Sequence, residues 1–341
     1  MKAMLLMATG ELERAEVLLK LASLPAPAPA ENEVLVKVSV CAVCHTELDE
    51  IEGRMPPPHL PVVPGHQVIG RVMQAGTRAK RFAVGERIGI AWINSACGEC
   101  EFCLRGEENL CSQFRATGRD ANGGYAEMVA VREDFAYPIP SVFSDVEAAP
   151  LLCAGAIGYR SLRLAGLEDG QNLGLTGFGA SGHLVLKMAR HLYPNSKIHV
   201  FARSEGERDF ARELGAVWAG SAEEESPAKL HCIIDTTPAW KPVVEAMKNL
   251  QPGGRLVINA IRKEDRDKDA LMHLDYPKHL WLEKEIKSVA NVSRRDVQEF
   301  LDLAARIPIR PETQEYPLEN AVQALRDLKA GGSRGAKILR I

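Results

Sequence analysis

Two residues that commonly bind metal ions lie close together near the start of the chain. Cys44 and His66 are separated by one loop, and the hydroxyl-bearing Thr46 is two residues from the thiol. Zinc binds cysteine sulfur and histidine nitrogen, and a catalytic zinc site keeps one of its four positions open. Two ligands do not complete such a site, and Cys153 is the candidate for the third. These residues predict a zinc centre that polarises an oxygen of a small molecule.

Four further cysteines have the spacing of a closed metal site. They follow the pattern C-x2-C-x2-C-x7-C, at Cys97, Cys100, Cys103 and Cys111. Four thiolates this close favour a structural zinc ion, which stabilises a lobe of the protein without catalysing a reaction. An iron–sulfur cluster uses related spacings, but Ser112 stands where the proline expected after the fourth cysteine would be.

The composition limits the possible classes of protein. A chain of 341 residues exceeds the usual size of one core, so we expect two domains. The hydrophobic fraction of 46%, the charged fraction of 26% and the net charge of −3 give no support for binding to nucleic acid or to a membrane. The apolar runs are too short for a signal peptide or a membrane span, and eight cysteines without an export signal favour metal sites over disulfides. We therefore expect a cytoplasmic protein.

The first part of the chain is expected to form short strands with few helices between them. Residues 34–40 alternate with period two, as in a strand with one buried face, and further strands are expected at 1–7, 68–73, 85–90 and 128–131. This pattern predicts an antiparallel, barrel-like domain. The sequence Ser144-Asp145-Val146-Glu147 is a capping box, which predicts a helix start shortly before Cys153. A strand at 336–341 is expected to return to this domain.

From residue 173 the pattern changes to strands that alternate with helices. Strands are expected at 173–176, 197–202, 232–235 and 256–260, which indicates a doubly wound parallel sheet. The first of these strands leads into a glycine-rich loop and an amphipathic helix, and the loop consists of Gly177, Phe178, Gly179, Ala180, Ser181 and Gly182. This is the context that a dinucleotide-binding motif requires, with the pyrophosphate at the helix N-terminus.

The end of the second strand bears on the choice of cofactor. NAD-binding proteins place a carboxylate there for the ribose 2′-hydroxyl, whereas this chain has Arg203 and Ser204. Arg203 could pair with a 2′-phosphate and Ser204 could donate to it, which favours NADP(H) over NAD(H). A solvated surface role for Arg203 remains the alternative.

Taken together, these segments resemble the zinc-dependent alcohol dehydrogenases of the medium-chain dehydrogenase/reductase superfamily, in particular a bacterial subgroup. The resemblance covers essentially the whole chain. It rests on residues 44–46, 65–70, 85–89, 97–111, 123–127, 150–155, 177–182 and 304–308.

The resemblance implies an α/β protein: a Rossmann doubly wound parallel sheet over residues 151–306 and a GroES-like, mainly antiparallel β catalytic domain over 1–150 and 307–341. It implies two zinc ions per chain, a catalytic one on Cys44, His66 and Cys153 and a structural one on the four clustered cysteines. Hydride would pass between a primary or secondary alcohol, or the aldehyde or ketone, and the nicotinamide cofactor. The substrate pocket is expected between the domains, and the protein is expected to be a homodimer or homotetramer.

The resemblance also assigns roles to single residues. Thr46 would take the proton from the bound alcohol, and His45 and Arg294 would contact the cofactor phosphates. Three positions depart from the family pattern. Gln67 replaces a glutamate, Glu47 replaces an aspartate beside the metal site, and Asp49 replaces a histidine in the proton relay.

Two other functions are weighed against an enzyme of this kind. Gln67 and Asp49 leave open a non-catalytic protein that binds a dinucleotide and zinc. A zinc-free quinone-type reductase of the same superfamily is the third hypothesis, and the eight cysteines and His66 argue against it.

Overall fold

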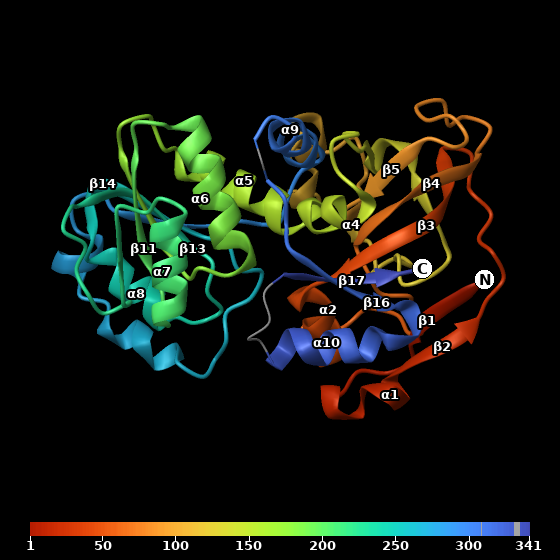
Figure 1. Cartoon of the computed structure of the whole chain (residues 1–341), viewed down its shortest axis with the longest axis horizontal. Coiled ribbons are helices and arrows are strands. Elements are labelled where there is room, and N and C mark those ends of the chain that lie inside the picture. The colour runs from red at the N-terminus through yellow and green to blue at the C-terminus, as the bar shows by residue number, and fades with distance from the viewer. Residues whose placement is uncertain (308, 331–334) are drawn as a thin grey trace. The chain divides into compact units, whose positions relative to one another are not determined.

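The computed structural model describes residues 1–307, 309–330 and 335–341, with the backbone but not the side chain of Ala180. The chain divides into two compact units (Figure 1). The first consists of Met1–Cys153 and Val292–Ile341, and the second is Ala154–Asn291.

These units differ from the expected domain limits at 150/151 and 306/307. Helix α9 (Arg294–Ala304) was expected in the dinucleotide-binding domain but belongs to the first unit. The physical reason is that α9 packs against the segment Ala149–Leu152, and its first residue is ion-paired with Glu108 and Asp134. Pro308, at the end of the resembling run 304–308, lies outside the described residues.

The first unit is built around β3 (Glu33–Val43), a strand of 11 residues. It pairs with antiparallel β4 (Gln67–Ala75), β8 (Met128–Arg132) and β17 (Ala336–Arg340). The sheet runs β16-β17-β3-β4-β5-β9, where the remaining strands are β16 (Thr313–Pro317), β5 (Arg87–Ile90) and β9 (Ala136–Pro138). Over residues 34–40, the face that carries the four even-numbered valines is buried as expected, while Lys37 on the other face is exposed. Leu35 is buried as well, and from residue 40 to Val43 every residue is buried.

The expected return of the last strand to this unit is confirmed. In β17, Lys337, Ile338 and Leu339 pair with Val43, Ala42 and Cys41 of β3, next to Cys44. Smaller elements complete the unit: strand pairs β1 (Lys2–Leu6) with β2 (Leu19–Ser23) and β6 (Ile93–Ser95) with β7 (Arg115–Ala116), and helices α1 (Ala15–Leu18), α2 (His45–Ile51), α3 (Glu101–Leu104), α4 (Asp145–Ala148) and α10 (Ala321–Ala330).

The second unit contains a sheet of six parallel strands in the order β12-β11-β10-β13-β14-β15. Numbered along the chain, this is the order 3-2-1-4-5-6 of the dinucleotide-binding fold. The strands are β10 (Asn172–Thr176), β11 (Lys197–Phe201), β12 (Trp218–Gly220), β13 (Leu230–Asp235), β14 (Leu250–Ile258) and β15 (Glu285–Ser288). The helices are α5 (Ala154–Ala165), α6 (Ala180–Leu192), α7 (Glu205–Glu213) and α8 (Lys241–Met247), and α5 packs against α6. The expected doubly wound parallel sheet is therefore confirmed.

Among the described residues, none of the helices combines the length and the apolar character that crossing a bilayer requires.

Candidate active site and metal centres

Cys44 lies at the start of α2, where the backbone turns from an extended strand into a helix. Its sulfur accepts a hydrogen bond from the Thr46 amide at 3.3 Å, and its own amide donates to Glu47 Oε2 at 2.8 Å. Cys44 and Glu47 thus form a capping box that fixes the direction of the thiol. A helix N-terminus also stabilises a thiolate, the form of cysteine that binds metal.

His66 is brought to Cys44 by a left-handed turn at Gly65. The φ angle of Gly65 is +99°, and a Cβ atom there would lie 2.4 Å from the Tyr125 ring, so only glycine fits. The His66 ring is buried and packs edge-on against Trp92, with ring centroids 4.9 Å apart. Its Nδ1 lies 2.6 Å from Glu47 Oε1, which leaves Nε2 facing the Cys44 sulfur. Glu47 therefore orients the imidazole.

The third expected ligand, Cys153, lies with these two residues. It follows the 3-10 helix Ala149–Leu152, and its sulfur, the Cys44 sulfur and a His66 ring nitrogen are all within 4.8 Å of one another. Zinc–sulfur bonds of about 2.3 Å and zinc–nitrogen bonds of about 2.0 Å in a tetrahedron place S and N about 3.6 Å apart. The distance from Cys44 Sγ to His66 Nε2 is 3.6 Å. The donor set and its spacing fit a zinc ion.

Burial and close contacts shift the pKa values of Cys44 and Glu47 in this cluster. The neighbouring Cys153 thiol and burial raise the pKa of Cys44 well above its usual value. Burial would raise the pKa of Glu47, but the charge and hydrogen bonds of His66 outweigh it and hold that pKa below its usual value. Zinc binding would therefore displace protons from the thiols.

The four clustered cysteines converge as their spacing predicts. Their sulfurs lie within 4.8 Å of one another; Cys97 is 3.8 Å from Cys103 and 3.5 Å from Cys111. Tetrahedral zinc with four thiolates has sulfurs about 3.8 Å apart, so this set also fits. Amide hydrogen bonds from Glu99 and Cys100 lower the pKa of Cys97 to about 6, while burial raises that of Cys103 to about 12.

Helix α2 separates the remaining expected catalytic residues onto two faces. Thr46 is buried beside Cys44, as a proton acceptor for a bound alcohol should be. His45 and Asp49 lie one turn apart on the outer face. The Asp49 carboxylate accepts from Arg54 Nε at 2.5 Å, so its charge is already paired. Partial burial lowers the pKa of His45 below its usual value.

Arg294 has partners that its sequence position did not predict. Its Nε donates to Glu108 Oε1 at 2.6 Å, Nη1 lies 3.4 Å from Asp134, and its guanidinium stacks over the Phe135 ring at 4.9 Å. The guanidinium expected to contact cofactor phosphates is thus held by two carboxylates.

The glycine-rich loop has the local geometry of a phosphate-binding turn. Gly177 has a φ of +80°, and a Cβ there would lie 2.8 Å from Thr236 Oγ1. A Cβ on Gly182 would lie 2.6 Å from the Gly177 carbonyl. At Gly179, in contrast, no atom of the described residues lies within 4 Å of the place that a Cβ would take. No described side chain caps the start of α6 at Gly179, so its amides are open to an anion. A pyrophosphate fits this turn.

The other residues of the loop differ in environment. Phe178 is buried and packs edge-on against Phe210 of α7 at 5.7 Å, so its ring is structural. Ser181 is half-buried in the first turn of α6, and the Ala180 side chain lies outside the described residues.

Only one of the two residues expected at the ribose is free to bind. Arg203 is exposed at the end of β11. Ser204 is the N-cap of α7: its hydroxyl donates to Glu207 Oε2 at 2.9 Å and accepts from the Glu207 amide. The expectation that Ser204 binds a 2′-phosphate therefore conflicts with its capping role, because binding would break this pair.

A buried ion pair beside the loop was not expected. Asp235, at the end of β13, accepts from Thr176 Oγ1 at 2.6 Å and from Thr237 Oγ1 at 2.8 Å, and it is also paired with Lys263. Lys263 additionally donates to the Thr237 and Ala239 carbonyls. This network fixes the segment after β14 at the carboxyl edge of the sheet, where such folds bind nucleotides.

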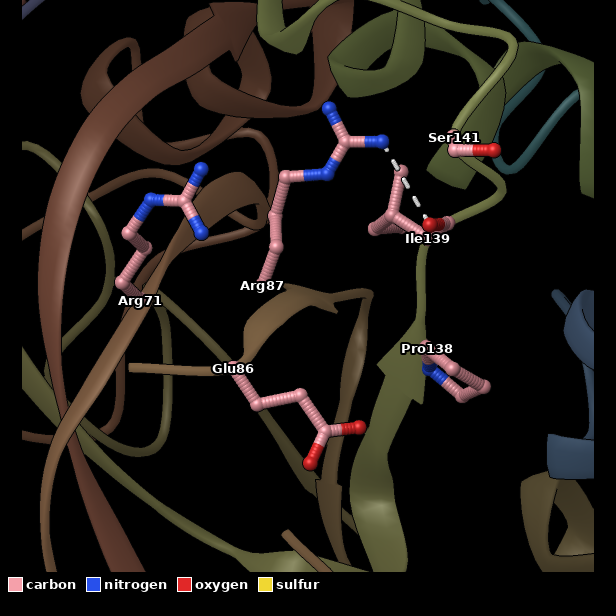
Figure 2. A pocket seen from close by; sticks show the side chains of 6 residues that line it. All are labelled: Arg71, Glu86, Arg87, Pro138, Ile139 and Ser141. Atoms are coloured by element: carbon pink, nitrogen blue, oxygen red, sulfur yellow. Dashed lines mark hydrogen bonds between the residues drawn. The ribbon is translucent and has the colours of Figure 1, made fainter. Parts of the chain in front are cut away.

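A surface cavity of about 430 Å³ lies in the first unit, away from both cysteine clusters. Figure 2 shows Arg71, Arg87, Glu86 and Ile139 lining it, with Arg87 turned toward the Ile139 carbonyl. Arg87 also donates to Phe143 and Pro140 carbonyls and to Asp145. Its hydrogen bonds hold a loop together and leave little of the guanidinium for a ligand.

Comparison with known proteins decides the family. Residues 30–141 match the alcohol dehydrogenase GroES-like domain. A probable alcohol dehydrogenase, AdhA, of Mycobacterium tuberculosis is 43% identical over 98% of this chain and 94% of its own length. The chain belongs to the zinc-dependent alcohol dehydrogenase family.

Other members of the family agree with this placement. An alcohol dehydrogenase of Geobacillus stearothermophilus is 33% identical over 92% of this chain and 93% of its own. The solved structure of a cinnamyl alcohol dehydrogenase from Sorghum bicolor is 26% identical, with a TM-score of 0.82 over 99% of this chain and 97% of that one. Membership of this alcohol dehydrogenase family makes the protein an oxidoreductase with the expected α/β fold.

Proposed function

We propose that the protein is a zinc-dependent dehydrogenase that transfers hydride between a primary or secondary alcohol, or the corresponding aldehyde or ketone, and NADP(H). The observation that carries this proposal is the meeting of Cys44, His66 and Cys153, from three separate segments, at a spacing that suits tetrahedral zinc. The 43% identical relative is named a probable alcohol dehydrogenase, which supports the same reaction.

The residues of the first unit would have the following roles in the reaction. Cys44, His66 and Cys153 would hold zinc, which supplies polarisation of the substrate oxygen and a lowered pKa for a bound hydroxyl. Glu47 keeps the His66 ring turned toward the other ligands. Thr46, buried one residue from the capped thiol, would exchange a proton with the substrate oxygen. Cys97, Cys100, Cys103 and Cys111 would hold a second, structural zinc.

The second unit would bind the cofactor through its glycine-rich turn. The open position at Gly179 and the uncapped start of α6 suit the pyrophosphate. Exposed Arg203 supports NADP(H) over NAD(H), since a guanidinium pairs well with a phosphate and no carboxylate ends β11. We assign no phosphate contact to Ser204.

We further propose a homodimer or homotetramer in a reducing compartment such as the cytoplasm. Edge strand β15 has exposed residues throughout, so it could extend the sheet across a two-fold axis. All eight cysteines are free thiols, seven of them in metal-binding sets, which a reducing environment preserves. Light scattering on the purified chain tests the assembly.

A turnover screen tests the reaction. The purified protein is assayed on alcohols and aldehydes with NADPH and NADH in parallel, and we expect faster turnover with NADPH. Cys44→Ser should abolish turnover while cofactor binding, measured by nicotinamide fluorescence, persists. Cofactor binding by the wild type without turnover on any substrate would favour the non-catalytic alternative, and absence of zinc from the purified protein would refute the proposal.

A further inference from the structure

Helix α2 carries a buried carboxyl group that the reaction described above does not use. Glu50 is 1% exposed, and neither of its side-chain oxygens has a hydrogen-bond partner among the described residues. Buried polar groups in proteins are nearly always hydrogen-bonded, to protein or to water. A buried acid with both oxygens unpaired therefore needs an explanation beyond packing.

The position of Glu50 on the helix relates it to Thr46. The two residues are four apart in α2, and positions i and i+4 are neighbours on a helix face, with Cβ atoms about 6 Å apart. Both are buried, whereas His45 and Asp49 share the outer face. A glutamate side chain at position i+4 is long enough to approach a hydroxyl at position i on the same helix face.

On its other side, Glu50 lies near a half-buried ion pair. Arg119 Nη1 donates to Asp120 Oδ1 at 2.8 Å, while the buried Arg119 Nε has no partner among the described residues. The electrostatic interaction of Glu50 with Arg119 and Asp120 shows that this pair is close to it. A donor without an acceptor, Arg119 Nε, thus lies near an acid without a donor, and both Arg119 and Asp120 are partly exposed.

Burial and the nearby carboxylates favour the acid form of Glu50. Burial raises its pKa well above the usual value, the Glu47 carboxylate adds to the rise, and His66 and Arg119 oppose it. The phenol of Tyr125 is a further buried neighbour. Helix α10 also packs against α2, but its Lys329 is bonded to Glu52 at 2.6 Å.

We propose that Glu50 is the proton-transfer residue for the Thr46 hydroxyl, connecting it to solvent along Arg119 and Asp120. The proposal rests on the alcohol dehydrogenase reaction proposed above. Asp49, at the position expected for the relay, is on the other face and paired with Arg54.

The transfers balance in either direction. In carbonyl reduction, bound NADPH would supply the hydride that adds to the carbonyl carbon, and the Thr46 hydroxyl would give its proton to the carbonyl oxygen. Thr46 takes the proton of Glu50, and the Glu50 carboxylate regains one from water beside Arg119. The net change is one hydride and one proton added to the substrate, and alcohol oxidation reverses each transfer.

The test compares Glu50→Gln with Glu52→Gln, the same substitution at the C-cap of the same helix, where Glu52 is paired with Arg54 and Lys329. In Glu50→Gln we expect kcat to fall about 100-fold and to lose its pH dependence, with KM nearly unchanged, because proton-transfer groups contribute about 10²-fold or more. Glu52→Gln should stay within about twofold of the wild type. Glu50→Asp, which retains an acid, should recover part of the lost rate.

Infrared difference spectroscopy gives a readout that does not depend on turnover. The carbonyl stretch of a protonated carboxylic acid should be present near neutral pH in the wild type and in Glu52→Gln, and absent in Glu50→Gln. Metal content and thermal unfolding of the variants establish that they are folded.

Two results would overturn the relay. One is a Glu50→Gln variant that keeps the wild-type kcat and pH profile while the wild type turns over normally, and the other is a wild type without the acid band. A wild type with no turnover at all would instead refute the proposed reaction together with its relay.

Discussion

The Glu47–His66 contact predicts the effect of one conservative substitution on metal affinity. The two oxygens of Glu47 contact two different groups: Oε1 lies 2.6 Å from His66 Nδ1, and Oε2 accepts from the Cys44 amide at 2.8 Å. In Glu47→Gln the side chain keeps its size but has only one acceptor oxygen, and its NH₂ group faces a donor. Either His66 or Cys44 therefore loses the contact that orients it, and the negative charge next to His66 is removed.

The magnitude follows from the burial of both partners, which are no more than 2% exposed. An unsatisfied buried donor costs about 1–3 kcal/mol. Loss of a partner that orients a metal ligand typically weakens metal affinity about 10–100-fold, which corresponds to about 1.4–2.8 kcal/mol. The two estimates agree, so we expect zinc to bind at the catalytic site about 10–100-fold more weakly in Glu47→Gln.

Competition with a chromophoric chelator measures this affinity on the full-length protein, with Asp49→Asn as the control. The control removes a carboxylate that is bonded to Arg54 and should bind zinc like the wild type. If the Glu47→Gln affinity lies within threefold of the wild type, then Glu47 does not orient His66 and the reasoning is refuted.

Three further substitutions test other parts of the structure. Cys111→Ser should reduce the zinc content by about one ion per chain and lower the Tm, because a closed site of four thiolates stabilises the fold. Elemental analysis measures the zinc content and calorimetry measures the Tm. An unchanged zinc content would contradict a structural zinc site at these cysteines. Arg203→Ala should raise the KM for NADPH about 10–100-fold, as expected for loss of a charge-assisted hydrogen bond of about 1.5–3 kcal/mol. The KM for NADH should stay nearly unchanged. Equal effects on the KM values of both cofactors would contradict a contact between Arg203 and the 2′-phosphate. Gly177→Ala should weaken cofactor binding measured by fluorescence, since its φ of +80° and the nearby Thr236 hydroxyl leave no room for a methyl group; wild-type affinity would show that this turn does not position the cofactor.

Features with a local cause could be predicted from the sequence. The four cysteines between Cys97 and Cys111 are close along the chain, so a short lobe suffices to bring their sulfurs together. The capping box at Ser144 and Glu147 forms as its spacing predicts, because both partners belong to one helical turn. The glycine-rich turn is likewise a property of a few consecutive residues.

Partners far apart along the chain could not be predicted in the same way. Arg294 and Glu108 are 186 positions apart, and their pairing assigns α9 to the first unit instead of the second. Ser204 was expected to be available to a ligand, but its hydroxyl is hydrogen-bonded to Glu207, three residues further along the chain. Glu50 could not be singled out from the sequence, because its burial next to Thr46 depends on the direction of α2 and on the fold around it.

The pairing of β17 with β3 has a consequence for how the protein is made. The ribosome releases Cys44 and His66 early, but the strand that supports Cys41–Val43 comes from residues 336–340, after the entire second unit has been synthesised. The second unit is one continuous segment, so it can fold before the residues that follow it have been synthesised. The sheet of the first unit therefore stays incomplete beside Cys44 until residues 336–340 have been synthesised, so the catalytic metal would be bound late in the maturation of the enzyme.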